Sequence, residues 1–577
     1  MKFFAFRRGL GLTCAVMLLL ILALTGCNRG NDNAPVAGGI IPPGGLEGLP
    51  SYLHPLPQRV TLRIGSSFGT PEGALVPPGT TPSTSTINQL LLEHLNIELY
   101  YMWEVPSAQA VERLQLALAA GDVPDIMRIG MVDFMELSRF GMLRDLSEAY
   151  ENHIHPQIRE MYEQFDNVPL QRSSYNGQLL GIPHISNTYQ QISLLWYRHD
   201  WLEALGLGVP TTMDELHAAA VAFVENDMSG QGNTTGLGLF DTIISWAPDA
   251  RGLFHGYGAY PTTWREINGE LVFGTVLPET QQALNRLRRM YADGALNPEF
   301  ATMNLDQLVA DISADRVGFI FGEWWLPNWP FNHNMDYNPA ADWRATIIVT
   351  PTGEPGTTII NRNNINLFHV VSANAPEGAE EALVKLLNQH WDISTNPQAP
   401  ERYGELIMQE NGWVANWVPG WVVNANEQFV NYILVNEALR TGDRSQFYLR
   451  QQFQLYELTR WFLEGVTFYD EDPEWETPTR AGAWGMYSSR VAPYGGWGTT
   501  MQVRERGLYI FNEFFGEPTP TQVSRGSILN DMWLEFYALY IMGDLPYEAW
   551  DTFVADWWRL GGEDWTREVN EQFRALQ

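Results

Sequence analysis

The alternation of apolar and polar side chains predicts an α/β body that begins near residue 59. Residues 59–64 (RVTLRI) alternate in the way a half-buried strand does. Residues 107–120 instead carry apolar side chains at helical spacing and end at Gly121, a residue type common directly after a helix. The apolar stretch at 122–127 then predicts a buried strand. A strand, a helix and a strand with short connections predict parallel sheets with helices on both faces.

Similar patterns continue towards the C-terminus. Residues 279–293 predict a helix that stops at Gly294, and the apolar runs at 317–321 and 345–349 predict strands. Residues 550–560 gather aromatic and aliphatic side chains on one face and predict an amphipathic helix packed on the body. A chain of 577 residues is far longer than one hydrophobic core normally serves, so we expect two lobes.

The first twenty-seven residues show a different pattern, with three basic residues ahead of an apolar run at 9–24. This layout is typical of a secretory signal, and the run is too short and too early for an ordinary membrane span. The sequence LTGC at 24–27 resembles the lipobox of bacterial lipoproteins. In that family the cysteine, here Cys27, receives a diacylglyceryl group and becomes the first residue after cleavage. A plain secretory signal or an uncleaved anchor is the alternative interpretation.

The stretch behind the lipobox is rich in Gly, Pro and Asn and contains little to bury. We therefore predict a lipoprotein signal peptide at 1–26 and a flexible tether at 27–58. Because two or more acyl chains make a stable anchor, the resemblance implies a body held at the extracytoplasmic face of a cell membrane. The lipobox leaves open whether that face borders a periplasm.

The charge balance narrows the class of ligand. The chain has 35 Lys and Arg against 67 Asp and Glu, and cleavage before Cys27 would leave a net charge near −35. Such a body repels nucleic acid and anionic lipid headgroups, so neither is an expected ligand. The two cysteines, Cys14 and Cys27, fall in the signal and the lipobox, so no disulfide is expected. The 22 Trp and 23 Tyr can serve a carbohydrate site as well as a core.

Beyond residue 60 the chain carries a series of short motifs. Each motif alone is weak evidence of a family, but their order and spacing together are strong evidence. The motifs are GDVPDI at 121–126, YNGQLLGIP at 175–183, LWYRHDWLEALGL at 195–207, PTTMDEL at 210–216, VGFIFGEWW at 317–325, VVSANAPEG at 370–378 and FVADWWRLGG at 553–562. Together they resemble family 1 of the extracellular solute-binding proteins of ABC importers, and in particular its larger sugar-uptake lipoproteins from Gram-positive bacteria. Residues 400–530 are the least similar part.

The resemblance implies an α/β, two-lobed periplasmic-binding-protein-like fold with hinge strands and an interlobe ligand cleft. In such a fold the lobes close on a ligand by hinge motion, and the ligand lies at the carboxyl ends of strands. We expect residues 59–181 and 371–440 in lobe 1, and residues 182–370 and 441–577 in lobe 2. The implied function is capture of an oligosaccharide by a monomeric binding protein, for delivery to the transmembrane subunits of an ABC permease.

Three candidate site residues lie after an expected strand of lobe 1 or after the first expected hinge. Arg128 follows the strand expected at 122–127, where a guanidinium would bind hydroxyls or a carboxylate in bidentate fashion. The alternative is a surface arginine paired with an acid. Asn187 and Tyr189 follow the first expected hinge and are either ligand contacts or ordinary loop residues.

Glu323, Trp324 and Trp325 follow the strand expected at 317–321 and form the strongest candidate cluster. Aromatic faces pack well on pyranose rings, and the indole edge adds a hydrogen-bond donor. We expect one of the two tryptophans in the cleft, with core packing as the alternative for the other.

Two further pairs complete the candidate site. Asn363 and Asn364 precede the second expected hinge, where their amides would bind sugar hydroxyls. Tyr494 and Trp497 flank a Gly-rich turn that is either a wall of the cleft or a structural turn.

Residues 227–238 resemble the calcium loop of the larger lipoproteins. An EF-hand-type loop requires carboxylates at alternating positions and a bidentate Glu at the twelfth position. Here Asp227 is followed by Ser229 and Gln231, and the twelfth position is Gly238. We therefore expect a metal-free loop and no cofactor.

The sequence favours a binding protein over an enzyme. It contains no His/Cys cluster with metal spacing, no serine nucleophile motif and no phosphate-binding loop. A chain with 67 Asp and Glu residues can supply the pair of carboxylates that glycoside hydrolysis requires, so an anchored glycosidase or lyase is the alternative. A surface adhesin would require neither hinges nor a cleft. The identity of the sugar is left open, as is a peptide ligand.

Overall fold

The computed structural model describes most of the chain beyond residue 48. The described residues are 49–68, 80–106, 109–185, 188–245, 248–361, 365–396, 398–403, 417, 420–422, 424–447, 450–465, 479–514, 516 and 518–576. The expected signal peptide and Cys27 lie outside them. Among the described residues, no helix is long and apolar enough to cross a membrane.

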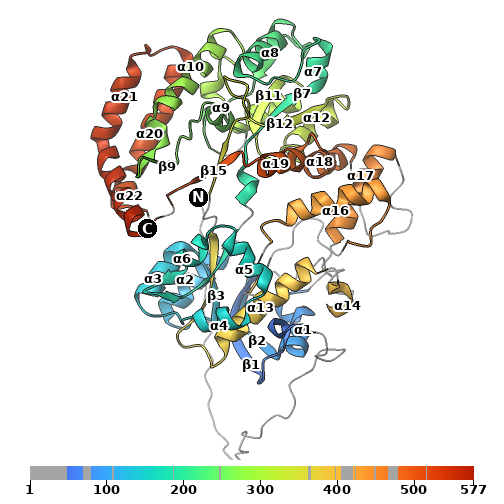
Figure 1. Cartoon of the computed structure of the whole chain (residues 1–577), viewed down its shortest axis with the longest axis vertical. Helices are drawn as coiled ribbons and strands as arrows, with labels where there is room; N and C mark the ends of the chain where they lie inside the picture. Colours follow the sequence, from blue (N-terminus) through green and yellow to red (C-terminus); the bar gives the residue numbers. More distant parts are fainter. Residues whose placement is uncertain are drawn as a thin grey trace, which may run out of the picture.

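Lobe 1 is built on a five-stranded sheet of order β2-β1-β3-β14-β6 (Figure 1). Alternate side chains of its strand β14 enter two different cores: Phe368 stacks on Phe134 of helix α3, whereas Val371 faces the core shared with helix α13. The strands are β2 (Ile97–Pro106), β1 (Val60–Phe68), β3 (Ile126–Ile129), β14 (Ile365–Val371) and β6 (Ile182–Ile185).

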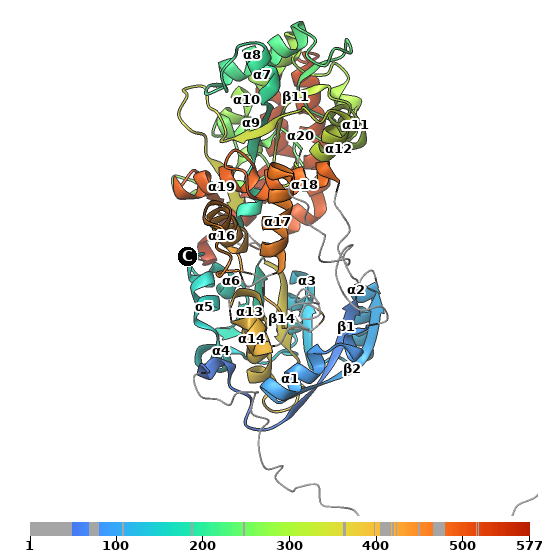
Figure 2. The same cartoon turned by 90° about the vertical axis from the view of Figure 1, so that its right-hand side faces the viewer.

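Lobe 2 is built on a four-stranded sheet of order β12-β7-β11-β8, and Figure 2 shows it stacked end to end with lobe 1. All six residues of β11 are buried, which explains why this strand reads as a continuous apolar run. The strands are β12 (Trp343–Thr346), β7 (Leu194–Arg198), β11 (Val317–Gly322) and β8 (Thr235–Leu237). Three two-stranded ladders pair β9 (Trp264–Ile267) with β10 (Glu270–Phe273), β13 (Thr358–Asn361) with β15 (Tyr509–Asn512), and β4 (Ser174–Tyr175) with β5 (Gln178–Leu179).

The expectation of parallel sheets is confirmed for some strand pairs only, because both large sheets are mixed. Strands β1, β2 and β3 are parallel, but β14 runs antiparallel to β3 and β6. In lobe 2, β7 runs antiparallel to β11 and β12. The reason is the passage of the chain between the lobes: β14 and β7 each enter a lobe from the other one and run away from the crossing, against the direction of their neighbours.

Helices cover both faces of the two sheets. The helix expected at 107–120 is α2, which ends at Gly121 with φ 70°, in the left-handed region that glycine favours. The helix expected at 550–560 ends at Trp557 and continues as a π turn to Gly562. Lobe 1 holds α1 (Ile87–Leu95), α2 (Ala110–Ala120), α3 (Met131–Arg139), α4 (Ser147–His153), α5 (Pro156–Glu163), α6 (Val168–Arg172), α13 (Ala379–Thr395) and α14 (Ala399–Tyr403). The remaining helices are α7 (His199–Ala204), α8 (Met213–Glu225), α9 (Arg251–Gly256), α10 (Pro278–Ala292), α11 (Leu305–Ser313), α12 (Phe331–Tyr337), α16 (Glu427–Thr441), α17 (Arg450–Glu464), α18 (Arg480–Arg490), α19 (Gly496–Glu505), α20 (Pro520–Met542), α21 (Ala549–Trp557) and α22 (Glu563–Leu576).

The buried apolar cores fall into two groups. One draws on residues 56–185 and 365–425, and the other on residues 189–360 and 429–573. Helix α16, which the sequence-based boundary at 440 assigns to lobe 1, contributes Phe429 to the second group. The body also begins earlier than residue 59, since Leu53 and Leu56 are buried within what was expected to be tether.

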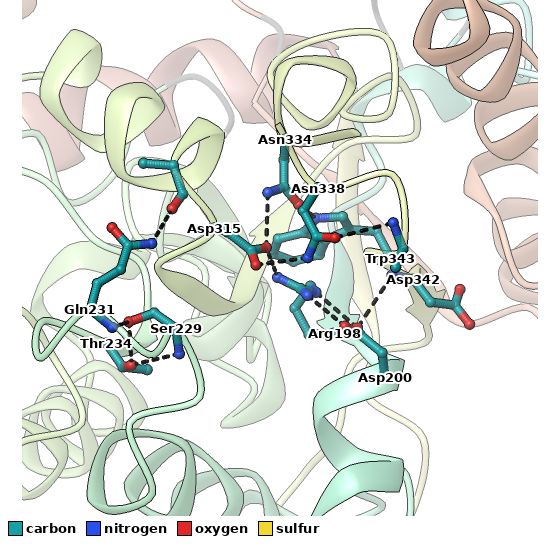
Figure 3. Close-up of polar contacts among 12 residues, drawn as sticks. Arg198, Asp200, Ser229, Gln231, Thr234, Asp315, Asn334, Asn338, Asp342 and Trp343 are labelled. Atoms are coloured by element: carbon teal, nitrogen blue, oxygen red, sulfur yellow. Dashed lines mark hydrogen bonds and ion pairs between the residues drawn. The ribbon is translucent and has the colours of Figure 1, made fainter. Parts of the chain in front are cut away.

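A buried ion network fixes the far end of strand β7 (Figure 3). Arg198 is fully buried and pairs with Asp200, at 2.5 Å, and with Asp315. Asn334 and Asn338 donate to the two carboxylate oxygens of Asp315 at 2.9 and 2.8 Å. The guanidinium therefore ties β7 to the turn before β11 and to helix α12, which holds the lobe 2 sheet in register.

Candidate ligand-binding site

Strand register places one edge of each sheet at the crossings between the lobes. In lobe 2, β7 begins at Leu194, which pairs with Gly322 at the carboxyl end of β11. In lobe 1, β6 ends at Ile185, which pairs with Ile365 at the start of β14. We call these two sheet edges the interlobe edges. Ligands of open α/β sheets bind at strand ends of this kind.

Glu323 is the first residue after β11 at the interlobe edge of lobe 2. Its side chain accepts a hydrogen bond from Trp325 Nε1 at 2.8 Å and lies 3.3 Å from the guanidinium of Arg251. Arg251 in turn pairs with Asp249 at 2.6 Å. These four residues form an ordered polar cluster in which donors and acceptors suited to sugar hydroxyls are already held in position.

The electrostatics of this cluster follow from burial and pairing. Burial raises the pKa of Glu323, while Arg251 and Trp325 oppose the rise. Burial lowers the pKa of Arg251, but the carboxylates of Asp249 and Glu323 outweigh it, so the net shift is upward. Arg251 thus stays charged and offers a fixed cation at the edge of the lobe.

The two adjacent tryptophans behave differently. Trp324 is 8% exposed and packs on Trp497, with ring centroids 5.2 Å apart. Trp497 is fully buried, so this pair belongs to the core. Trp325 is partly exposed and stacks with Trp329, whose ring centroid lies 6.2 Å away at an interplanar angle of 21°. The partly exposed pair beside Glu323 is an aromatic surface of the kind that packs against sugar rings.

On lobe 1, Arg128 lies one residue from the end of β3, directly opposite His369 of β14. His184 of β6 projects from the same face, with its ring 6.2 Å from that of His369 and 4.3 Å from that of Trp421. Burial lowers the pKa of Arg128 to about 10. Burial, together with the charge of Arg128, lowers the pKa of His184 to about 4, so the histidine is neutral near pH 7.

A small cavity opens at the carboxyl ends of β1 and β3. Its volume is about 80 Å³, and its lining includes Ser66, Trp103 and Arg128. The guanidinium of Arg113, on helix α2, lies 4.4 Å from the centre of the Trp103 ring. The cavity therefore brings a hydroxyl, an indole and the Arg128 guanidinium together at a strand end, although its volume is smaller than that of a whole sugar ring.

Tyr189 lies in the first crossing but points into the core. It is 8% exposed and packs edge-on against Phe429 and Tyr509. Burial and the hydrogen bond with Tyr509 raise its pKa to about 12. Its position supports the hinge region and leaves little surface for a ligand.

The crossing segments are joined by side-chain amides. Asn361 donates to Gln191 Oε1 at 2.9 Å, and Asn512 donates to Asn361 Oδ1 at 3.1 Å. These two hydrogen bonds link the crossing between β6 and β7, the crossing between β13 and β14, and the end of strand β15.

The other candidate residues are more distant or lie outside the described part of the chain. The Arg344 guanidinium lies 4.6 Å from the centre of the Tyr494 ring. In the β12–β7 ladder Arg344 is opposite Tyr197, which is three residues along β7 from the interlobe edge. Asn187, Asn363 and Asn364 lie outside the described residues.

The loop at 227–238 is held by hydrogen bonds of its own (Figure 3). The Asp227 carboxylate accepts hydrogen bonds from Ser229 Oγ at 3.0 Å, Thr234 Oγ1 at 2.8 Å and Gly232 N at 2.9 Å. Gln231 instead donates to Ala314 O at 2.7 Å. Hydroxyl and amide donors thus occupy the carboxylate oxygens that a calcium ion would require.

Several residues of the interlobe edges were missed in the sequence. Trp329 could have been recognised from the sequence, because it follows Trp325 by four residues in the same Trp- and Pro-rich run. The sequence gives no comparable indication for the other two residues. No strand pattern precedes Arg251, and Trp103 lies inside a strand rather than after one.

Two α/β lobes with aromatic and charged side chains at strand ends are the architecture expected of a solute-binding protein, whose ligand lies between domains. Residues 80–388 match the family model described as bacterial extracellular solute-binding protein, which is more than half of the chain. The chain belongs to this family.

Individual relatives cover parts of the chain. This chain is 29% identical over 233 residues to the polygalacturonan/rhamnogalacturonan-binding protein YtcQ of Bacillus subtilis. The match covers 39% of this chain and 44% of YtcQ, so the chain spans about half the length of that relative. It is 21% identical to the fructooligosaccharide ABC transporter substrate-binding protein FusA of Streptococcus pneumoniae, covering 72% of this chain and 71% of FusA. A solved HMO-binding, ABC-transporter-associated solute-binding protein from Bifidobacterium longum infantis has a TM-score of 0.56 at 13% identity, covering 89% of this chain and 98% of that one. This structural likeness confirms the two-lobed fold.

Proposed function

We propose that this chain is a lipid-anchored substrate-binding protein of an ABC importer, which captures an oligosaccharide between its lobes and delivers it to the permease. The observation that carries the proposal is the polar and aromatic cluster of Glu323, Arg251, Trp325 and Trp329 at the interlobe edge of lobe 2. Membership of the solute-binding family supports it, as do the relatives YtcQ, a polygalacturonan/rhamnogalacturonan-binding protein, and FusA, a fructooligosaccharide ABC transporter substrate-binding protein.

The proposed site has two sides. Glu323, Arg251, Trp325 and Trp329 bind the sugar from lobe 2, while Arg128 and the cavity with Ser66 and Trp103 bind it from lobe 1. Trp324, Trp497 and Tyr189 are left out because they are buried in the core. The predicted roles of Asn187, Asn363 and Asn364 are kept as part of the proposal.

We further propose that the lobes divide near residues 185, 361 and 425 and close by bending at these crossings. This boundary falls earlier than 440, because α16 packs on α17 and α19. In the proposed cell-surface arrangement, Cys27 carries the lipid and the acidic body stands off from an anionic membrane.

A thermal-shift screen of oligosaccharides tests the function. A ligand present at 100 times its dissociation constant adds about 2.7 kcal/mol to the free energy of unfolding, which raises the melting temperature measurably. Trp325→Ala and Trp329→Ala should each weaken binding about tenfold. Trp558→Ala, a partly exposed tryptophan on the outer flank of lobe 2, is the matched control and should respond like wild type.

Two results would contradict the proposal. One is a screen in which no oligosaccharide shifts the melting temperature, or in which all three variants respond alike. The other is release of shorter products on prolonged incubation, which would indicate a glycosidase or lyase.

A further inference from the structure

The outer flank of lobe 2 carries a groove that takes no part in the proposed sugar site. Helices α20 and α21, at the left of the upper lobe in Figure 1, enclose about 770 Å³ between them. The lining positions on α20 run from Ile528 to Leu539 at intervals of three and four residues, which is one face over about 16 Å of helix. Residues from Leu545 to Asp556, ending on α21, supply the facing side. The groove therefore has the length and straightness of about three turns of a helix.

The floor of the groove is apolar. Phe536 and Phe553 stack with ring centroids 4.2 Å apart, and Met532 and Leu545 lie beside them. Ile528, at one end, is 59% exposed although it lies within a 23-residue helix. An apolar stripe of this kind is what the apolar face of a third helix would cover.

The rims of the groove are acidic. Asp531 and Glu535 line it from α20, and Glu548 and Asp556 line it from the other side, while no basic residue is among its lining residues. Asp556 pairs with Arg559 at 2.8 Å on the surface. The other three carboxylates form no ion pair within the described ranges of the chain.

We propose that the α20–α21 groove is a docking site for a basic amphipathic helix of a protein partner. Such a helix would place its apolar face on Ile528, Met532 and Leu545, which reach the surface above the buried Phe536–Phe553 pair. Its flanking Lys and Arg side chains would meet the carboxylates on both rims. A small apolar ligand would fill the floor but leave the acidic rims unmatched. The groove shares no lining residue with the proposed sugar site, so a docked helix and a bound sugar would not compete for the same side chains.

The test uses the full chain and a fluorescein-labelled 18-residue helix with a leucine face and lysine flanks, followed by anisotropy at 0.15 M salt. Asp531→Asn with Glu535→Gln should weaken binding threefold to tenfold. Glu160→Gln with Glu163→Gln removes the same charge from exposed positions on α5 of lobe 1, and this control should change binding less than twofold. Ile528→Ala should weaken binding several-fold, whereas Val523→Ala, exposed on the same helix outside the groove, should not.

Three outcomes would overturn the proposal: equal weakening by the two charge variants, equal binding of a scrambled peptide with the same composition, or equal binding of an uncharged apolar helix. The first two would reduce the interaction to attraction by an acidic chain, and the third would indicate an apolar ligand. The oligosaccharide response of the same variants reports on the proposed function separately.

Discussion

Replacing Arg198 by Met removes the cation at the centre of the lobe 2 ion network while keeping most of the aliphatic stem. Arg198 is fully buried, and the side chains of Asp200 and Asp315 are 30% and 13% exposed. Removing one partner of a buried pair costs ~3–5 kcal/mol, because it leaves the other charge uncompensated. Since both carboxylates keep some contact with water, we expect the lower end, about 3 kcal/mol.

The matched control is Arg440→Met, which breaks a helix-surface pair with Glu437 whose side chains are 70% and 55% exposed. Because both charges are largely solvated, this loss should be far smaller than that of Arg198→Met. Hydrogen exchange reads the two lobes separately: peptides from β7 and β11 should lose protection in the Arg198 variant, and peptides from β1 and β3 should not.

A double-mutant cycle with Asp315→Asn sharpens the test. Asp315 has φ 64°, a conformation that asparagine tolerates, so the substitution removes the charge without backbone strain. It also replaces one acceptor oxygen by an amide donor that faces Asn334 or Asn338, and this loss is included in the single-variant value. The double variant should lose less stability than the sum of the two single variants, by about 0.5–3 kcal/mol. The reasoning fails if Arg198→Met costs no more than Arg440→Met, or if the two losses simply add.

The remaining predictions concern protons and metal. Burial, with a smaller effect from Arg251, lowers the pKa of His255 to about 3, so its contribution to stability is complete above pH 6.5 and is lost as the pH falls towards 3. Relative to pH 7.5, stability at pH 5 should fall by ~2 kcal/mol from this residue, and urea unfolding of His255→Asn should show a correspondingly smaller loss; an unchanged loss would contradict the assignment. Because the Asp227 carboxylate is satisfied within its loop, 1 mM calcium or EDTA should leave the melting temperature unchanged, and a calcium-dependent rise that Asp227→Asn abolishes would show the opposite.

Local patterns in the sequence predict the parts of the fold that local forces determine. Strand β11 and helix α2 were predicted close to their observed bounds, because an apolar run and a helical period with a terminal glycine are properties of neighbouring residues. The place of β14 between β3 and β6 could not be predicted, since its partners come from distant parts of the chain.

In the candidate site, too, the sequence predicts what depends on neighbouring residues and not what depends on contacts across the fold. The sequence singled out the run from Glu323 to Trp325 correctly as the end of a strand, but it could not tell which indole enters the core. That choice depends on Trp497, which reaches Trp324 from a helix more than 160 residues later. Arg251 was missed because its role arises from Glu323 across the fold.

The central position of β14 has a consequence for the order in which the molecule can be made. On the growing chain, β3 and β6 both appear before residue 186, but the strand that joins them ends at residue 371. Until then β3 has one open edge and β6 has no partner strand, and the whole sheet of the second lobe is synthesised in the interval. The N-terminal half of the chain therefore cannot reach its final form while it is being translated. It must be kept from pairing with other chains until its last strand arrives.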